Sequence, residues 1–448
     1  MNCESIFFNL QEGKSNFKKS RDEILDIREK KFREILKYAY SKSNFYNKLY
    51  SSYGISEENI KNISITQLPS IDKKILIDNF DDLVTVPDIK KDLIEKFAVK
   101  NENLNDKYLD KYNIVHSSGS VGIPTYFVYD ENAWEYMLSS AIRASLFDLT
   151  TDEIISHTSK GLRIAYIAAT QGRYGGVMAA SSCIKGLNSS QLLLNVNLPL
   201  EQWIDELIAF KPNVIVGYPS ALKILCQLIE SRKVNVDVFK VISCGEPLIK
   251  SLREYIEKYL DTDIVNIYGA SESLILGMET RNSDGIYFFD DVNYLEVIDD
   301  STYITSLYNF AQPLIRYKLS DELILKKLTS NELLPYTKIE SILGRDEDIM
   351  WFINENGIED FLHPLVLDEI CTDGLLSYQF IQHSKEKFEI LAEVKDISNC
   401  SSIETDINVE MKKILSEKNL DNVDFEVGFT NCIPINPKTG KKPLIYKD

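Results

Sequence analysis

The chain has 448 residues, of which 44% are hydrophobic and 26% charged, a globular composition that excludes disordered and collagen-like chains. At ~100–200 residues per domain, this length predicts two to four domains. Fifty Lys and Arg residues against 68 Asp and Glu give a net charge of −18, which repels phosphate backbones and anionic lipid. We therefore expect no nucleic-acid partner and no membrane partner.

The cysteines and histidines argue against several classes of protein. The seven cysteines are scattered and none forms a C-x-x-C pair, which predicts reduced thiols and no zinc knuckle. Neither an apolar leader nor an uninterrupted apolar run of ~18 residues occurs, so we expect a cytoplasmic protein. The four histidines are dispersed, and the absence of H-E-x-x-H and G-x-S-x-G disfavours a metallohydrolase or a nucleophile-elbow hydrolase.

The first predicted elements are an amphipathic helix and a parallel sheet. Residues 20–52 carry apolar side chains at helical spacing among charges, and LRIAYIAA begins a strand pattern at residue 162. Between residues 201 and 268, strand-like runs (VIVG, FKVISC and IVNIY) alternate with helical patterns, which predicts parallel strands covered by helices on both faces. Ligands bind at the carboxyl ends of such strands, so chemistry is expected after Val216, Cys244 and Tyr268.

The second half of the chain has a different pattern of residue types. Residues 286–325 are rich in Tyr, Ile, Val and Phe with turn residues between, which predicts antiparallel strands. The tail reads as strand, helix and strand followed by a polar end, typical of a small α+β unit of ~100 residues. The predicted fold is therefore α/β, with a large N-terminal domain (1–343) and a small C-terminal domain (344–448).

Several short segments could carry chemistry. VHSSGSVGIPTYF (115–127) concentrates serines and glycines, whose backbone N–H groups can face an anion, although it lacks the ending of a Walker A loop. Alone, it is equally explained as a surface turn. In IYGASES (267–273), a Tyr and the carboxylate of Glu272 lie at the end of a predicted strand. The segment SCGEPL (243–248) lies in the same way at the end of the preceding strand. In isolation these are also consistent with a buried Tyr and a solvated Glu.

Two further candidates lie towards the C-terminus. Asp321 in RYKLSD follows a strand-like run and could accept hydrogen bonds from a ribose, or be a plain turn residue. Lys441 in NPKTGKKP follows Gly440 and could equally belong to a solvated basic terminus.

Taken in order, SSGSVGIP, SCGEPL, IYGASES, RYKLSD, LGRDED and PKTGKK resemble the core motifs of adenylate-forming enzymes, the acyl-CoA synthetase and adenylation-domain superfamily. The opening KYAYSKSNFYNKLYSSYGI and the following LPSIDKKILIDNFDDLV resemble the phenylacetate-CoA ligase branch and its capsule-biosynthesis relatives. The likeness covers nearly the whole chain. It implies a large N-terminal domain with parallel sheets and a small mobile C-terminal domain.

The resemblance also implies roles for individual residues. The loop that holds ATP phosphates would be formed by Ser117, Ser118, Gly119, Ser120 and Gly122. The adenine pocket would be formed by Gly245, Glu246, Pro247 and Tyr268, and the cofactor would also contact Gly269, Ala270 and Ser271. Glu272 would be the catalytic glutamate that holds Mg²⁺, Asp321 the ribose ligand, and Arg345 a further nucleotide contact. Lys441 would be the catalytic lysine that reaches the carboxylate and the α-phosphate.

The sequence departs from the family pattern at several positions. Val121 stands where Thr is common, Ser320 where Gly is usual, and Glu347 at a hinge position that is usually Asp. Some members of the branch carry a Cys and a His as metal ligands soon after the Tyr-Gly motif, where this chain has Thr280 and Tyr287. We therefore predict no structural zinc.

The implied activity is ATP-dependent activation of a carboxylic acid to an acyl-adenylate, with Mg²⁺, followed by transfer to CoA. An aromatic or compact acid is expected, with Trp134, Tyr136, Gly217 and Tyr218 around it. The acceptor could instead be a carrier-protein thiol, an amine or a hydroxyl. The alternative function is that of a nucleotide-binding scaffold without catalytic activity. A homodimer is also possible.

Overall fold

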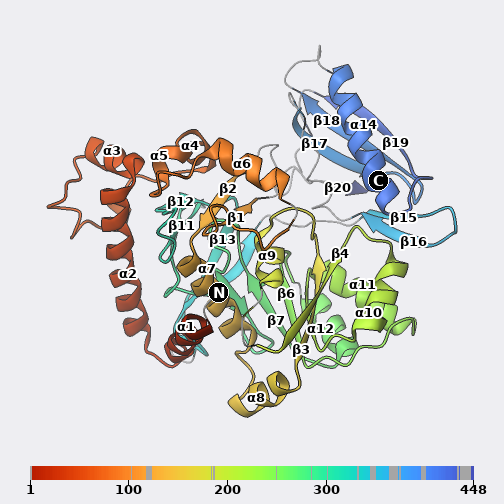
Figure 1. Ribbon diagram of the computed structural model, residues 1–448, viewed down its shortest axis with the longest axis horizontal. Helices are drawn as coiled ribbons and strands as arrows, with labels where there is room; N and C mark the ends of the chain where they lie inside the picture. Colours follow the sequence, from red (N-terminus) through yellow and green to blue (C-terminus); the bar gives the residue numbers. More distant parts are fainter. Residues whose placement is uncertain are drawn as a thin grey trace.

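The computed structural model describes residues 3–101, 103–117, 124–182, 184, 187–248, 250–283, 285–299, 301–329, 332–343, 350–362, 372, 375–394, 400–430, 433 and 445–447. Figure 1 shows a large body that contains the N-terminal helices and the main sheet, with the C-terminal strands and helix at one edge. Across these residues, no helix combines the length and the apolarity needed to cross a membrane.

Helices form the N-terminal region. The predicted helix over residues 20–52 is two helices, because Ser43 ends the first and accepts a hydrogen bond from Tyr46 N–H at the start of the second. Ser20 and Glu23 form a capping box at the start of the first. The helices of this region are α1 (Cys3–Asn16), α2 (Arg21–Lys42), α3 (Asn44–Ser52), the 3-10 turn η1 (Ile65–Gln67), α4 (Lys73–Asp78), α5 (Phe80–Leu83) and α6 (Lys91–Lys100).

Two adjacent buried aspartates anchor these helices to the rest of the body. Asp290 pairs with Arg21 and Arg28 of α2. Asp291 receives two hydrogen bonds from Arg143, at 2.7 and 2.9 Å. Burial alone would raise the pKa of Asp291, but the Arg143 guanidinium and its hydrogen bonds lower that pKa to about 2. The Asp291–Arg143 ion pair is therefore charged at neutral pH, and it joins segments that are far apart in the sequence.

The central sheet has nine strands in the order β13-β14-β9-β8-β7-β6-β5-β3-β4. Its parallel half comprises β3 (Leu162–Ala168), β4 (Ser189–Asn195), β5 (Val214–Gly217), β6 (Lys240–Cys244) and β7 (Ile264–Tyr268). Its antiparallel half comprises β8 (Gly277–Glu279), β9 (Ile286–Phe288), β13 (Glu322–Lys326) and β14 (Thr337–Leu343). The predicted parallel strands are confirmed, and the sheet they form is mixed.

Helices cover both faces of the parallel half (Figure 1). One group packs α11 against β3 and β6, and the other group packs α7 against β7 and α9 against β3 and β4. The first group is α10 (Leu200–Phe210), α11 (Pro219–Glu230) and α12 (Lys250–Leu260). The second is α7 (Glu131–Ser145), α8 (Thr151–Ser159) and α9 (Gly175–Ser181).

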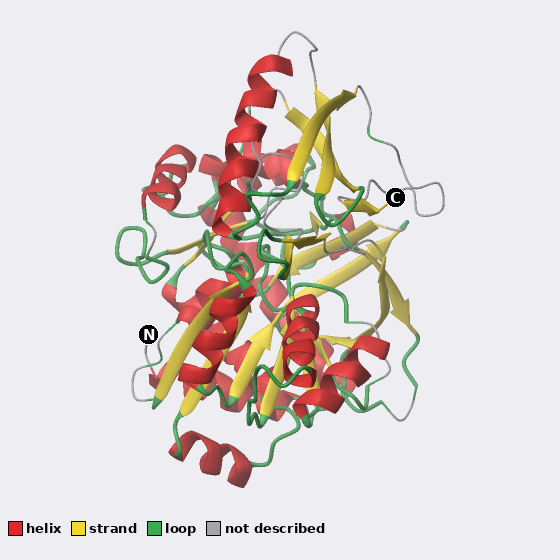
Figure 2. Cartoon of the chain, turned by 90° about the vertical axis from the view of Figure 1, so that its right-hand side faces the viewer, coloured by secondary structure: helices red, strands yellow, loops and turns green. Residues whose placement is uncertain are grey.

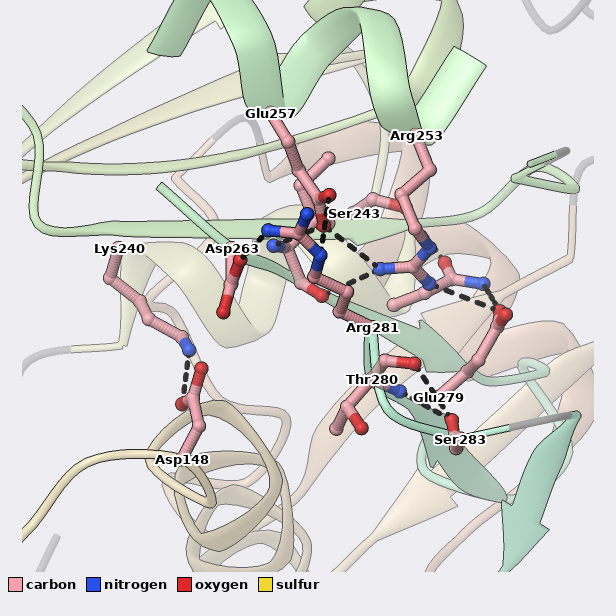
Figure 3. Close-up of polar contacts among 12 residues, drawn as sticks. Asp148, Lys240, Ser243, Arg253, Glu257, Asp263, Glu279, Thr280, Arg281 and Ser283 are labelled. Carbon is pink, nitrogen blue, oxygen red and sulfur yellow. Dashed lines mark hydrogen bonds and ion pairs between the residues drawn. The ribbon is translucent and has the colours of Figure 1, made fainter. Parts of the chain in front are cut away.

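A network of charges fixes α12 to the sheet (Figure 3). Arg253 on α12 pairs with Glu279 on β8 at 3.3 Å and donates to the carbonyl of Ile264 on β7 at 2.7 Å. Arg281 pairs with Asp263 at 3.0 Å, just before β7. Because these contacts span three elements, they hold α12, β7 and β8 in fixed relative positions.

Smaller antiparallel sheets complete the N-terminal body. The prediction of antiparallel strands over residues 286–325 is confirmed by β10 (Asn293–Ile298), β11 (Ser301–Ser306) and β12 (Tyr317–Lys318), which form a three-stranded sheet. A separate hairpin is formed by β1 (Asn113–His116) and β2 (Tyr126–Tyr129).

The C-terminal region is the predicted α+β unit (Figure 2, top). Its four-stranded sheet has the order β19-β18-β17-β20 and is accompanied by one long helix and a hairpin. The elements are β15 (Met350–Ile353), β16 (Glu359–Leu362), β17 (Leu375–Gln382), β18 (Lys387–Val394), α14 (Cys400–Glu417), β19 (Asp424–Thr430) and β20 (Ile445–Lys447). The domain boundary at 343/344 adjoins residues outside the described ranges and stays a prediction.

A buried ion pair ties this unit to the N-terminal body. Lys418, which follows α14 and is fully buried, donates to Asp360 of β16 at 2.8 Å and to the carbonyl of Leu198 at 2.9 Å. The second oxygen of Asp360 accepts from the N–H of Leu200 at the start of α10, at 3.2 Å. The ring of Trp203 packs edge-on against Phe361 beside this contact.

We expect Lys418→Met to destabilise the protein by about 3–5 kcal/mol, because it leaves the buried Asp360 carboxylate without its partner. Urea unfolding measures the loss. Lys385→Met is the matched control, since it breaks an exposed pair with Glu359 whose typical contribution is below about 1 kcal/mol. Equal losses in the two variants would contradict the structural role of the buried pair.

Candidate functional site

The parallel half of the sheet borders a cavity of about 970 Å³. It begins at the carboxyl ends of β3, β5, β6 and β7, where the sequence predicted the chemistry, and it continues along the sheet beneath α7 and α9. Its volume lies near the top of the ~300–1,000 Å³ range of small-molecule sites.

In the turn after β6, the backbone of Gly245 lies close to the ring of Tyr218 at the cavity wall. Gly245 has φ +83, and a Cβ atom there would lie 2.6 Å from the ring of Tyr218. Only glycine combines this conformation with this contact. Tyr218 itself follows β5, is buried, and has a pKa that desolvation raises well above its usual value, so its hydroxyl stays neutral.

Two predicted nucleotide residues meet after β7 and β12. The hydroxyl of Tyr268 donates to the carboxylate of Asp321 at 2.9 Å, and both residues are about nine-tenths buried. Their neighbours Gly269 and Ser320 line the cavity. The residues expected to hold adenine and ribose therefore lie together at its edge.

The turn that carries Glu272 is held by side chains from three other segments. Tyr129 donates to the carbonyl of Ser271 and Tyr308 to that of Ser273, both at 2.8 Å. Asn293 donates to the carbonyl of Ile275 at 2.9 Å. A Cβ on Gly269 would lie 2.2 Å from the carbonyl oxygen of Leu274, so the two ends of the turn touch. The backbone of this turn is thus fixed in place.

Glu272 faces the cavity from this turn. It hydrogen-bonds to Tyr317, whose pKa is raised chiefly by burial and further by the Glu272 charge. Mg²⁺ is usually held by one or two carboxylates together with substrate phosphates, so a single cavity-facing glutamate fits such an ion. Among the residues the structure describes, no group of three or more His, Cys, Asp or Glu could hold a metal by itself.

The predicted phosphate loop starts and ends at the cavity wall. Ser117 and Thr125 face each other: Ser117 N–H donates to the Thr125 carbonyl at 2.9 Å, and Thr125 N–H donates to Ser117 Oγ at 3.2 Å. Both line the cavity. Ser118, Gly119, Ser120, Val121 and Gly122 lie outside the described residues.

His116 supports the start of this loop. Its Nε2 accepts from the backbone N–H of Arg173 at 2.9 Å, so the proton sits on Nδ1, which lies 3.1 Å from the Ser117 carbonyl. Burial lowers the pKa of His116, and the Arg173 charge lowers it further. The ring is therefore neutral at pH 7.

Some predicted site residues occupy other positions. Glu246 accepts from the N–H and the hydroxyl of Ser220, at 3.0 and 2.8 Å, and so caps the start of α11. Pro247 and Gly217 are near the strand ends but are not among the described residues that line the cavity. A Cβ on Gly217 would lie 2.7 Å from the carbonyl oxygen of Ile167, so this glycine permits close packing of β5 against β3.

Trp134 and Tyr136, expected around the acid, are not among the described residues that line the cavity. Trp134 is buried and donates to Ser182 at 3.1 Å, and the Tyr136 hydroxyl accepts from Lys31 at 2.6 Å. On a helix, residues three or four apart share a face, and α7 presents Met137, Leu138 and Ala141 to the cavity instead. The two residues therefore pack beside the cavity, and their assignment to the acid stays a prediction.

Other cavity residues were missed from sequence. Asp72 and Lys73 line the cavity because Ile71 pairs with Tyr317, which places the start of α4 beside β12. Lys318 lines it as well. Only LPSIDKK, quoted for the family resemblance, could have indicated the first two. Arg345, Glu347 and Lys441 lie outside the described residues.

The chain is similar to several known proteins. No protein-family model matches the chain. The phenylacetate-coenzyme A ligase of Aromatoleum evansii is 25% identical over 392 residues, 81% of this chain and 79% of that protein. Protein CapK of Staphylococcus aureus is 21% identical over 452 residues, 94% of this chain and 88% of that protein. The chain is thus similar along most of its length to the phenylacetate-CoA ligases and to CapK.

A solved structure extends this relationship to the fold. The 2-hydroxyisobutyryl-CoA ligase in complex with 2-HIB-AMP and CoA, in its thioesterification state, superposes with a TM-score of 0.61 at 17% identity. The match covers 97% of this chain and 91% of that one. The predicted resemblance to adenylate-forming enzymes is thereby confirmed, and this chain has the fold of that solved ligase.

We expect Gly245→Ala to destabilise the protein by about 1–3 kcal/mol more than Gly54→Ala, because the added methyl group collides with the Tyr218 ring. Gly54 is the matched control: its φ is +72, yet nothing lies within 4 Å of the point that a Cβ atom would occupy there. Urea unfolding measures both. Calorimetry should also show weaker binding of an ATP analogue to Gly245→Ala alone, and equal behaviour of the two variants would contradict the expectation.

Acidification should weaken the fold through His116. Because its pKa is lower in the folded state than the unfolded value of ~6.5, the unfolded state binds more protons in this range, and stability falls as pH drops through ~6.5. Urea unfolding between pH 7.5 and 5.5 should show a smaller loss in His116→Asn than in wild type. His383→Asn, in the partly exposed turn between β17 and β18, should keep the wild-type slope. An unchanged slope in His116→Asn would refute the assignment.

Proposed function

We propose that the chain activates a carboxylic acid with ATP and transfers the acyl group to CoA. The observation that carries this proposal is the meeting of the Tyr268–Asp321 pair, Glu272 and the flanks of the Ser/Gly loop at one end of one cavity. Nucleoside, metal-bound phosphate and acid would then share that end. A cavity that continues beyond the strand ends leaves room for the acyl group.

The reaction has two steps. A carboxylate oxygen attacks the α-phosphorus, and the bond to the β-phosphate breaks, so that pyrophosphate leaves with the electron pair and an acyl-adenylate remains. The sulfur of CoA then attacks the acyl carbon, the bond to AMP oxygen breaks, and the thiol proton is lost to solvent. Both steps need positioning and charge stabilisation more than they need a strong base.

The chain's residues divide this work. Tyr268 and Asp321 would orient adenosine, and the Ser/Gly loop that begins at Ser117 is proposed to bind the phosphates. Glu272 would hold Mg²⁺, which would supply neutralisation of the phosphate charge. Lys441 and Arg345 are proposed to act from a separate C-terminal domain, residues 344–448, with Lys441 reaching the carboxylate and the α-phosphate.

The likeness to a solved acyl-CoA ligase structure that holds CoA supports the second step. The TM-score to 2-hydroxyisobutyryl-CoA ligase is 0.61 in the thioesterification state, with 2-HIB-AMP and CoA bound, and 0.53 in an open conformation.

ATP–pyrophosphate exchange with a panel of carboxylic acids tests the first step, and thioester formation with CoA tests the second. Glu272→Gln should slow exchange by about 10²–10³ and weaken its Mg²⁺ dependence, because the swap keeps the volume and deletes the charge. Glu340→Gln, on an exposed position of β14, is the matched control and should exchange at the wild-type rate.

Three outcomes separate the alternatives. Exchange without thioester formation would direct the search to carrier-protein, amine or hydroxyl acceptors. Silence across a broad panel of acids would favour the catalytically silent scaffold. A Glu272→Gln variant that behaves like Glu340→Gln would refute the assignment of the metal to this turn.

A further inference from the structure

The cavity extends well beyond the strand ends that would bind the nucleotide. Along β6 it is lined by Cys244, Ile242 and Lys240, and along β3 by Tyr166, Ile164 and Leu162. Alternate residues of a strand point to the same face, so the cavity follows one face of the sheet over the whole of β6. The four-residue step from Cys244 to Lys240 corresponds to about 13 Å at ~3.3 Å per residue.

The opposite wall is helical and also apolar. Leu138, Ala141, Ile142 and Leu146 of the α7 region face the sheet across the cavity. Towards its far end, Ile154 and His157 of α8 close the wall. Figure 1 shows α8 beyond the starts of the strands, at the end of the sheet opposite to the C-terminal unit.

Aliphatic side chains along this stretch are only half-buried. Ala141, Ile142, Leu146, Ile164 and Val216 are all only partly buried, and all of them line the cavity. Protein interiors are otherwise close-packed, and unburied aliphatic surface costs ~25 cal/mol per Å². An apolar ligand that covered these side chains would recover that free energy.

Charge is concentrated at the two ends of the cavity. At the strand-end side lie Glu272, Lys318, Asp72 and Lys73, and at the far end lies Lys240, which pairs with Asp148. Of the described residues that line the stretch between them, none is charged. A ligand with a polar head at the strand ends and an apolar body fits this pattern.

On the basis of the proposed function, we propose that this cavity is the acyl site and that it takes an extended aliphatic carboxylic acid of medium to long chain. The carboxylate would lie near Glu272 and the loop flanks, and the chain would run along β6 and β3 towards Lys240. The ~13 Å stretch is close to the ~15 Å that a lipid acyl chain occupies in one leaflet, half of the ~30 Å hydrocarbon core. A compact aromatic acid, as expected from sequence, would occupy only the first part.

The test measures binding and exchange for a series of straight-chain acids, from butanoate to dodecanoate, with phenylacetate as the compact acid. Calorimetry on the full-length protein gives affinity without requiring catalysis, and ATP–pyrophosphate exchange gives activation. Affinity should rise about fourfold per added methylene, the equivalent of ~0.8 kcal/mol per buried CH₂, at least as far as decanoate.

Two variants narrow the channel from opposite walls: Ile164→Phe on β3 and Ala141→Phe on α7. Each should weaken dodecanoate binding at least tenfold while leaving butanoate and phenylacetate within twofold. Ile324→Phe is the matched control, since it makes the same change at an exposed position of β13 outside the cavity, and it should alter neither.

Affinity that levels off at butanoate or phenylacetate would overturn the proposal, as would equal losses for short and long acids in both narrowed variants. Exchange confined to phenylacetate, with no chain-length dependence in binding, would leave acid activation standing and refute the extended chain. A third outcome is that affinity rises with chain length, that this rise stops at a shorter acid in the narrowed variants, and that no acid supports exchange. This outcome would support the channel and refute activation.

Discussion

The site depends on one rigid turn between β7 and β8. Its carbonyl groups accept hydrogen bonds from Tyr129, Tyr308 and Asn293, which belong to β2, to the segment after β11 and to β10. The turn therefore cannot shift unless three elements of the N-terminal body shift with it. Glu272 projects from this turn, and Tyr268 precedes it, so a carboxylate and an aromatic hydroxyl keep fixed positions relative to one another.

This turn is also where the sheet changes direction. The strands from β4 to β7 run parallel, whereas β8 returns antiparallel to β7. The parallel half supplies the strand ends that border the cavity, and the later strands bring Asp321 back to the same edge. Because the chain reverses direction at β8, the strand ends that bind the ligand lie beside Asp321, which is about fifty positions further along the chain than Tyr268.

The sequence carried much of this information because the decisive signals are local. Buried strands, Gly-containing turns and the order of six motifs were predicted, and the structure brings Tyr268 to Asp321. The directions of side chains on α7 were not predictable, since Trp134 and Tyr136 differ from Met137 only in helical phase. The apolar channel was hidden for a different reason: Ile142, Ile164 and Val216 have the pattern of core residues, and only the tertiary structure shows that they face a cavity.

The aspartate pair that anchors the N-terminal helices has a consequence for synthesis of the chain. Arg21 cannot reach Asp290 until the 269 residues that separate them in sequence have left the ribosome. At ~5–20 residues per second, this delay is on the order of tens of seconds. During that time α2 exposes an apolar face that includes Phe32, Ile35 and Leu36, all of which are buried in the finished protein. The apolar face of this segment therefore stays uncovered until most of the N-terminal body has been synthesised.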